Sequence, residues 1–213
     1  MLQLFHSTKP HPFLGAGREV RIFLHEKGVD VPLVELDIAS GKSRRAEFLR
    51  KNPSGQLPAL ELEDGRVIAE SVAICELFED RHPAPALIGR TPEEKAETRM
   101  WQRRVEFGIT ENIVNGWRFG EGREWWKSRG RVLSEASDGL KAIARDKLAW
   151  LDGLMAGRRF IVGDRFTLAD ILLVVGLDFG AFVGQGLPPE LSNLAAWKTR
   201  VDARASVVAS GQP

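Results

Sequence analysis

The chain has 213 residues, 43% of them hydrophobic, and its 30 basic and 29 acidic residues give a net charge of +1. This balance gives no reason to expect nucleic acid or an anionic membrane surface as a partner. No stretch approaches 18 apolar residues, and the start lacks a basic segment followed by an apolar run. We therefore expect neither a membrane span nor a secretory signal.

The rarest residue types limit the chemistry. Cys75 is the single cysteine, which excludes an internal disulfide framework and fits a reducing cytoplasm. One Cys and four scattered His show no metal-ligand spacing, so no metal is expected. The chain contains no Tyr, so no reaction of this protein can use a tyrosine hydroxyl.

The first eighty residues alternate between strand and helix patterns. The Asp64-Gly65 pair is a hairpin signal that joins two of the strands. The order β-α-β-α-β-β-α predicts a small mixed sheet covered by helices. The expected strands are residues 2–6, 31–38, 59–62 and 66–69, and the expected helices are 18–27, 43–50 and 71–81.

The Pro- and Gly-rich stretch that includes residues 83–92 predicts a linker between domains 1–82 and 93–213. Beyond it no convincing strand pattern appears. Thr91 and Pro92 begin one predicted helix as its N-cap and first residue, and Glu94, three residues after the cap, completes a capping box. Thr167 and Asp170 form a second capping box, for which we expect a purely structural role.

One apolar series in the helical half has two interpretations. Its members recur every four residues, which favours a helix face in the core. A helix beside a neighbouring domain often also lines a pocket at the junction. The series comprises Trp101, Val105, Ile109, Ile113 and Trp117.

Three stretches resemble the cytosolic glutathione transferases. They are "NPSGQLPALELEDGRVIAESVAICELFEDRHP", "FIVGDRFTLADI" and "LSNLAAWKTRVDARASV", and they occur in the order typical of that family. The resemblance implies an α/β thioredoxin-like domain, with a mixed four-stranded sheet, followed by an all-α helical-bundle domain. It also implies a homodimer in which the first domain of one subunit contacts the second domain of the other.

The resemblance implies which residues hold glutathione. Pro58 would follow a cis peptide bond that turns the backbone of Leu57 outward to pair with an extended peptide. Ser71 would bind the γ-glutamyl carboxylate at a helix N-terminus, and Glu70 would hold the γ-glutamyl ammonium. Gln56 and Lys42 are candidates for the other end of the tripeptide, and a solvated surface position is the alternative for Lys42.

The loop after the first strand supplies the thiol donor in this family, from Tyr, Ser or Cys. Tyr is absent, and Cys75 lies inside a helix, where a buried structural thiol is expected. Ser7 and Thr8 are therefore the candidates, with Ser7 slightly favoured; otherwise backbone N–H groups serve. Gly17 occupies the position where Ser-type members usually carry their serine, and this loop is about four residues longer than usual.

The resemblance implies a glutathione transferase that activates the thiol of glutathione for attack on an apolar electrophile. Alternatives on the same fold are disulfide or peroxide reduction, β-aryl ether cleavage, and a binding module without catalysis. His11 and Lys9 are candidates for added positive charge near the sulfur, although a solvated position is the more common role of such residues. The candidates for the electrophile pocket are His11, Phe13, Trp101, Phe107 and Trp117, with Phe119, Trp125 and Trp126 nearby in sequence.

Overall fold

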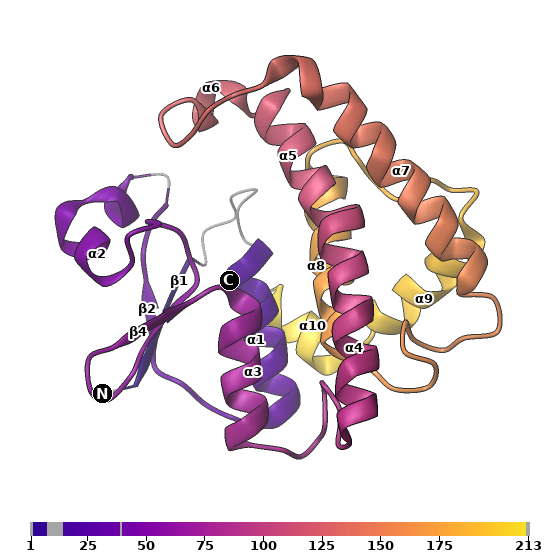
Figure 1. Ribbon diagram of the computed structural model, residues 1–213, viewed down its shortest axis with the longest axis horizontal. Helices are drawn as coiled ribbons and strands as arrows, with labels where there is room; N and C mark the ends of the chain where they lie inside the picture. Colours follow the sequence, from indigo (N-terminus) through magenta and orange to yellow (C-terminus); the bar gives the residue numbers. More distant parts are fainter. Residues whose placement is uncertain (1, 8–14, 39, 212–213) are drawn as a thin grey trace. The chain divides into compact units, whose positions relative to one another are not determined.

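The structure, a computed structural model, describes residues 2–7, 15–38 and 40–211. Contacts divide it into two compact units (Figure 1). The first unit runs to Arg90 and includes the segment from Arg204 onward, and the second is Thr91–Ala203. The sequence analysis places that last segment with the helical half instead, so the two divisions differ at the end of the chain.

A four-stranded mixed sheet forms the centre of the first unit, with strand order β2-β1-β3-β4. The β1 strand pairs in parallel with β2 and antiparallel with β3, which in turn pairs antiparallel with β4. The fold class and strand order therefore match the expectation, although the second strand covers three residues rather than eight. The strands are β1 (Gln3–His6), β2 (Leu33–Glu35), β3 (Ala59–Glu61) and β4 (Val67–Ala69).

Helices lie on both faces of this sheet, with α1 and α3 on one side and α2 on the other (Figure 1). Successive side chains of a strand point to opposite faces. Phe5 of β1 meets Phe48 of α2, with ring centroids 5.5 Å apart. The helices are α1 (Gly15–Lys27), η1 (Lys42–Arg44), α2 (Ala46–Lys51) and α3 (Ser71–Arg81), so the predicted helix over 43–50 is a 3₁₀ turn followed by a short α-helix.

A buried ion pair fixes the linker to the first unit. The Nζ atom of Lys27 lies 2.5 Å from a carboxylate oxygen of Glu79, and both side chains are almost fully buried. Lys27 also donates to the backbone oxygens of His82 and Pro85, at 2.8 and 2.6 Å. Glu79 accepts from the N–H of Ile88 at 2.9 Å. The linker is therefore part of the first unit, because its polar backbone satisfies a buried pair of charges.

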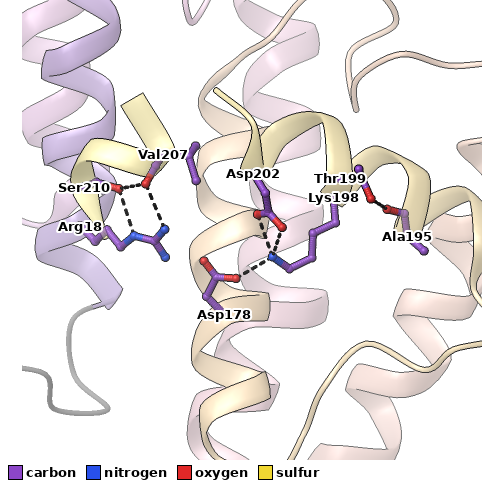
Figure 2. A network of polar contacts seen from close by, with 8 residues as sticks. All are labelled: Arg18, Asp178, Ala195, Lys198, Thr199, Asp202, Val207 and Ser210. Atoms are coloured by element: carbon purple, nitrogen blue, oxygen red, sulfur yellow. Dashed lines mark hydrogen bonds and ion pairs between the residues drawn. The ribbon is translucent and has the colours of Figure 1, made fainter. Parts of the chain in front are cut away.

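The last helix, α10 (Ala205–Ser210), packs on α1 through polar contacts. Arg18 donates to the hydroxyl of Ser210 at 3.1 Å, as the left part of Figure 2 shows. Arg204 makes a bidentate ion pair with Glu26 of α1, at 2.9 and 2.7 Å. These long-range contacts explain why the chain end belongs to the first unit.

The described part of the second unit is helical apart from isolated bridges near residue 160. No helix of the described residues is long and apolar enough to cross a membrane. The predicted stripe from Trp101 to Trp117 is buried, which confirms its core interpretation. The helices are α4 (Pro92–Val105), η2 (Glu106–Thr110), α5 (Glu111–Phe119), α6 (Arg123–Trp126), η3 (Ser134–Ala136), α7 (Ser137–Leu154), α8 (Leu168–Phe182) and α9 (Ser192–Asp202).

A π-helical turn, η2, interrupts the run from α4 to α5. The side-chain amide of Asn112 donates to the backbone oxygens of Phe107 and Gly108, at 2.7 and 3.0 Å, and so satisfies carbonyls in the irregular turn. Helix α8 approaches this turn closely at Gly176, where a Cβ atom would stand 2.4 Å from the methyl group of Thr110. A side chain at position 176 would therefore push the two helices apart.

The predicted capping box at α8 is present and is part of a larger buried network. The carboxylate of Asp170 accepts from the N–H groups of Thr167 and Ile161, both at 3.0 Å, and from the indole of Trp197 at 2.8 Å. Burial raises the pKa of Asp170 to about 6, against the hydrogen bonds that lower it. Asp170 thus joins α8, the preceding loop and α9.

A second polar contact joins α9 to α8. Lys198 of α9 bridges Asp178 of α8 and Asp202 (Figure 2).

Replacing Glu79 with Gln should lower the free energy of unfolding by about 3–5 kcal/mol, because it leaves the buried charge of Lys27 without a partner. Chemical denaturation of the variant and of the wild type measures this loss. Glu97→Gln is the matched control, since it breaks the exposed pair with Arg165 and should cost less than about 1 kcal/mol. Equal losses in the two variants would contradict the role of the buried pair.

Candidate functional site

The sheet register brings three predicted site segments to one end of the sheet, which is named the site edge. Phe5 of β1 is paired with Ala59 of β3, and Ala59 is also paired with Ala69 of β4. Ser7 follows the end of β1, Leu57 and Pro58 precede β3, and Glu70 and Ser71 follow β4. Because these strands are antiparallel neighbours, all three segments lie at the same end of the sheet.

The width of this edge suits a short peptide. Neighbouring strands lie about 4.8 Å apart, so β1 and β4 are separated by roughly 10 Å across β3. Three residues of extended chain span about the same distance. The edge can therefore contact a tripeptide along its whole length.

Ser7 is the described thiol-donor candidate, and it is 7% exposed. It directly follows His6, whose side chain faces α1, because a Cβ atom at Gly17 would stand 3.6 Å from that of His6. Alternation along the strand then turns Ser7 toward the opposite face. Thr8, His11, Phe13 and Lys9 lie outside the described residues, and the choice of Ser7 over Thr8 stays a prediction.

His6 is a buried group that the sequence analysis did not identify. It is 2% exposed, and its Nδ1 atom has no hydrogen-bond partner among the described residues. Burial lowers the pKa of His6, and the positive charge of Arg21 lowers it further, against Glu35. Both effects favour the neutral form of the imidazole.

The Leu57–Pro58 peptide bond is cis, as the resemblance implies. The loop before it is fixed by Asn52, whose buried amide donates to the backbone oxygen of Gln56 at 2.9 Å. Gly55 adopts a positive φ of 61°, where a Cβ atom would stand 2.9 Å from the backbone oxygen of Ser43. Asn52 and Gly55 thus set the direction in which the chain enters β3, a role that the sequence analysis did not assign to them.

Glu70 has a positive φ of 68°, the one such value among the described residues other than glycine. A non-glycine residue in this region costs about 1–3 kcal/mol and persists only where the surroundings require it. Glu70 connects β4 to α3, and its backbone oxygen accepts from Ile74 at 3.1 Å. The strained link directly precedes the first N–H groups of α3, which have no partner within the helix.

The other candidates of the first unit have contrasting environments. Lys42 begins η1 and is exposed, as is Gln56. Cys75 is fully buried in α3, and burial raises the pKa of its thiol well above the usual range. A thiol without solvent contact and with a raised pKa is inert, so the structural interpretation of Cys75 is confirmed.

The second-unit candidates do not form one cluster. Trp101 packs against Trp150, with ring centroids 6.1 Å apart, and Trp117 meets Phe179 edge-on at 5.7 Å. Phe107 is 54% exposed, and the guanidinium of Arg103 lies 3.8 Å from the centre of its ring. A pocket role for these three side chains stays a prediction.

Comparisons with known proteins agree with this architecture. Residues 17–81 match the model of the glutathione S-transferase N-terminal domain, and residues 134–205 match that of the C-terminal domain. Glutathione S-transferase 2 of Saccharomyces cerevisiae is 33% identical over 195 residues, which cover 88% of this chain and 82% of that protein.

Two further proteins widen the comparison. The crystal structure of Gtt2 from Saccharomyces cerevisiae has a TM-score of 0.89 at 30% identity and covers 98% of this chain and 99% of that one. The maleylacetoacetate isomerase of Pseudomonas aeruginosa is 30% identical over 73% of this chain and 72% of its own. Fold and matches together define an enzyme of the glutathione transferase class. The chain belongs to the glutathione S-transferase family.

The backbone strain at Glu70 predicts an unusual order of stabilities. Glu70→Gly should be more stable than Glu70→Ala by about 1 kcal/mol, because glycine adopts a positive φ without steric cost. Thermal or urea unfolding of both variants measures the difference. The same two substitutions at exposed Glu63, in the hairpin turn, serve as the control and should show no advantage for glycine. A more stable alanine variant at position 70 would disprove the strain.

Proposed function

We propose that this enzyme binds glutathione along the edge formed by Ser7, Leu57–Pro58 and Glu70–Ser71, and that Ser7 stabilises the glutathione thiolate. The register that aligns these three segments is the observation that supports the proposal. The N–H groups at the start of α3 would take the γ-glutamyl carboxylate, and Glu70 the ammonium group beside it. Leu57 would pair with the peptide backbone, with Gln56 and Lys42 at its other end.

The thiol requires a donor because it is mostly protonated when free. Its pKa near 8.5 leaves about 3% thiolate at pH 7. Lowering that pKa by about two units takes roughly 2.7 kcal/mol, which one or two well-placed donors supply. Ser7 fits this role because the chain has no Tyr and Cys75 is buried.

The proposed reaction is attack of the thiolate on an apolar electrophile held by the aromatic residues of the helical unit. Reduction of a disulfide or peroxide and cleavage of a β-aryl ether remain the alternative reactions. The similarity to a maleylacetoacetate isomerase adds glutathione-dependent isomerisation as a candidate. Parallel assays with an aromatic chloride, a model disulfide, a hydroperoxide, a β-aryl ether and maleylacetoacetate distinguish these reactions. Turnover of the chloride supports the first, whereas turnover confined to another compound would replace it.

Ser7→Ala should raise the pKa of bound glutathione by about one to two units and lower kcat/KM about tenfold or more, because a hydrogen bond to the thiolate is lost. The ultraviolet absorbance of the thiolate, followed against pH, measures the pKa. Thr8→Val tests the other hydroxyl. Ser40→Ala is a control, since the exposed Ser40 hydroxyl donates to the backbone of Asp37. An unchanged thiol pKa in Ser7→Ala would exclude Ser7 as the donor.

A binding module without catalysis is the third alternative, and the same titration decides it. Glutathione bound to the wild type with an un-ionised thiol at pH 7, without turnover of any electrophile, would support the module. A clear thiolate signal at pH 7 would contradict it.

A cytoplasmic location of the enzyme is also part of this proposal.

We infer that the enzyme forms a homodimer. In the second unit, exposed apolar side chains of α4, η2 and α7 are accompanied by Arg103, Arg104 and Lys147, which lie over aromatic rings. In the first unit, α3 carries the acidic residues Glu76 and Asp80. Opposite charges thus favour contact between the first unit of one copy and the second of another. The exposed apolar residues of this face are Met100, Phe107, Ile143, Trp150 and Leu154.

Trp150→Glu should convert the dimer to a monomer, because Trp150 is 43% exposed and is the aromatic residue of this face that both Arg104 and Lys147 lie over. Light scattering after gel filtration measures the mass. Phe182→Glu is the matched control, since Phe182 is an exposed aromatic residue of the same unit outside the face. A monomeric wild type, or a dimer that persists in Trp150→Glu, would contradict the inference.

A further inference from the structure

Aromatic rings and guanidinium groups pack against one another where α5 meets α6. Trp117 and Trp125 have ring centroids 6.1 Å apart, and Trp125 and Trp126 are 5.9 Å apart. The guanidinium carbon of Arg118 lies 4.1 Å from the ring centre of Trp126, and that of Arg129 lies 3.5 Å from the ring centre of Trp125. All these residues belong to the second unit.

The guanidinium of Arg118 makes a hydrogen bond to an uncharged side chain. One terminal nitrogen donates to the amide oxygen of Asn115 at 3.1 Å, and the Asn115 amide donates to Glu111 at 3.1 Å. The Nε atom of Arg118 is buried and has no hydrogen-bond partner among the described residues. Burial lowers the pKa of Arg118, although Glu111 acts in the opposite direction. The positive charge of Arg118 is therefore partly removed from water, with Asn115 as its hydrogen-bond partner and Glu111 as the carboxylate that acts on it.

The carboxylates near Arg118 in the sequence have other partners. Glu121 pairs with Lys141 at 2.6 Å, and Glu124 pairs with Lys127. Within the described part of the chain, no carboxylate lies within 4.0 Å of the Arg118 guanidinium. A charge removed from water without a partner is costly, and an incoming anion would offset that cost.

We propose that Arg118 and Trp126 form an anion subsite for a planar aromatic carboxylate. The guanidinium is planar, and its N–H groups form the fork that matches a carboxylate; the indole of Trp126 lies against this group. The half-buried indoles of Trp125 and Trp126 each have a guanidinium over one face, and the aromatic ring of the ligand would pack against the part of these rings that is left exposed. The inference extends the proposed function, because it adds a carboxylate to the apolar electrophile.

Open space lies beside this part of the chain. Phe119 and Gly120, which directly follow Arg118, line a cavity of about 430 Å³, to which Arg118 and Trp126 themselves do not contribute. Its charged lining residues are the acidic Glu121, Glu124 and Asp138 and the basic Arg123 and Lys141. That volume is within the usual range for small-molecule sites. A ligand therefore has room next to the turn that follows Arg118.

Benzoate and benzamide test the subsite directly, since they differ in charge but share a planar ring. Calorimetric titration of the full-length protein, saturated with glutathione, should show benzoate binding about tenfold or more tightly than benzamide. Quenching of tryptophan fluorescence provides a second signal, because Trp126 contacts the guanidinium. Equal affinities, or no saturable benzoate binding, would overturn the proposal. This result does not depend on the folding of any variant.

Arg118→Met should abolish the preference for benzoate, because it keeps much of the side-chain volume and removes the charge. Arg118→Lys keeps the charge without the fork and should retain part of the preference. Arg159→Met is the matched control, since exposed Arg159 also lies over an aromatic ring, that of Phe160 at 5.4 Å, and should leave the preference unchanged. An undiminished preference in Arg118→Met would also overturn the proposal.

Conjugation assays separate this inference from the proposed function. The wild type should turn over 4-chloro-3-nitrobenzoate with a higher kcat/KM than the corresponding benzamide, and Arg118→Met should lower that ratio about tenfold. If the benzoate preference in binding is present but neither chloride reacts, the subsite stands and the proposed transferase reaction fails. If both chlorides react equally and benzoate shows no preference, the reaction stands and the subsite fails.

Discussion

The pairing register of β3 with its two neighbours determines where the candidate site lies. Ala59 is level with Phe5 on one side and with Ala69 on the other. A shift of one residue in either ladder would turn the side chains beyond the strand ends to the opposite face. Each of the site segments is polar or irregular and could not fix its own position. The ladder, supported by the contact between Phe5 and Phe48, aligns them.

Buried carboxylates stabilise the parts that surround this frame. In the first unit, Glu79 joins α3 to the linker and neutralises Lys27. In the second unit, Asp170 connects the start of α8 with the preceding loop and with Trp197 of α9. Both carboxylates accept backbone N–H groups from irregular segments, which need partners once they are removed from water. Each unit thus has its own polar anchor within an apolar core.

The sequence predicts the strand and helix order because hydrophobic periods, a hairpin dipeptide and two capping boxes are local signals. The cis bond at Pro58 and the roles of Glu70 and Ser71 came from family resemblance, since no local pattern specifies them. The association of α10 with α1 was missed because Arg204 and Glu26 are 178 residues apart in the chain. The environments of His6 and Arg118 were missed for a similar reason, since burial and unpaired nitrogens depend on tertiary packing.

The positive φ of Glu70 illustrates the same limit. Glutamate has little tendency to adopt that conformation, so its sequence context suggests an ordinary helix start. The strain arises because a single residue, Glu70, connects the end of β4 to the start of α3. A glycine at this position would have indicated a positive φ from the sequence alone, whereas a glutamate gives no such indication. We interpret the strain as part of a ligand-binding edge, which is where such conformations concentrate.

A crystal structure of the protein with bound glutathione tests the central claim most directly. The proposal predicts the γ-glutamyl carboxylate within hydrogen-bond distance of the backbone N–H of Ser71. It also predicts the Ser7 hydroxyl within hydrogen-bond distance of the sulfur. Glutathione bound away from the Leu57–Pro58 edge, or a sulfur whose nearest donor belongs to another residue, would contradict the account.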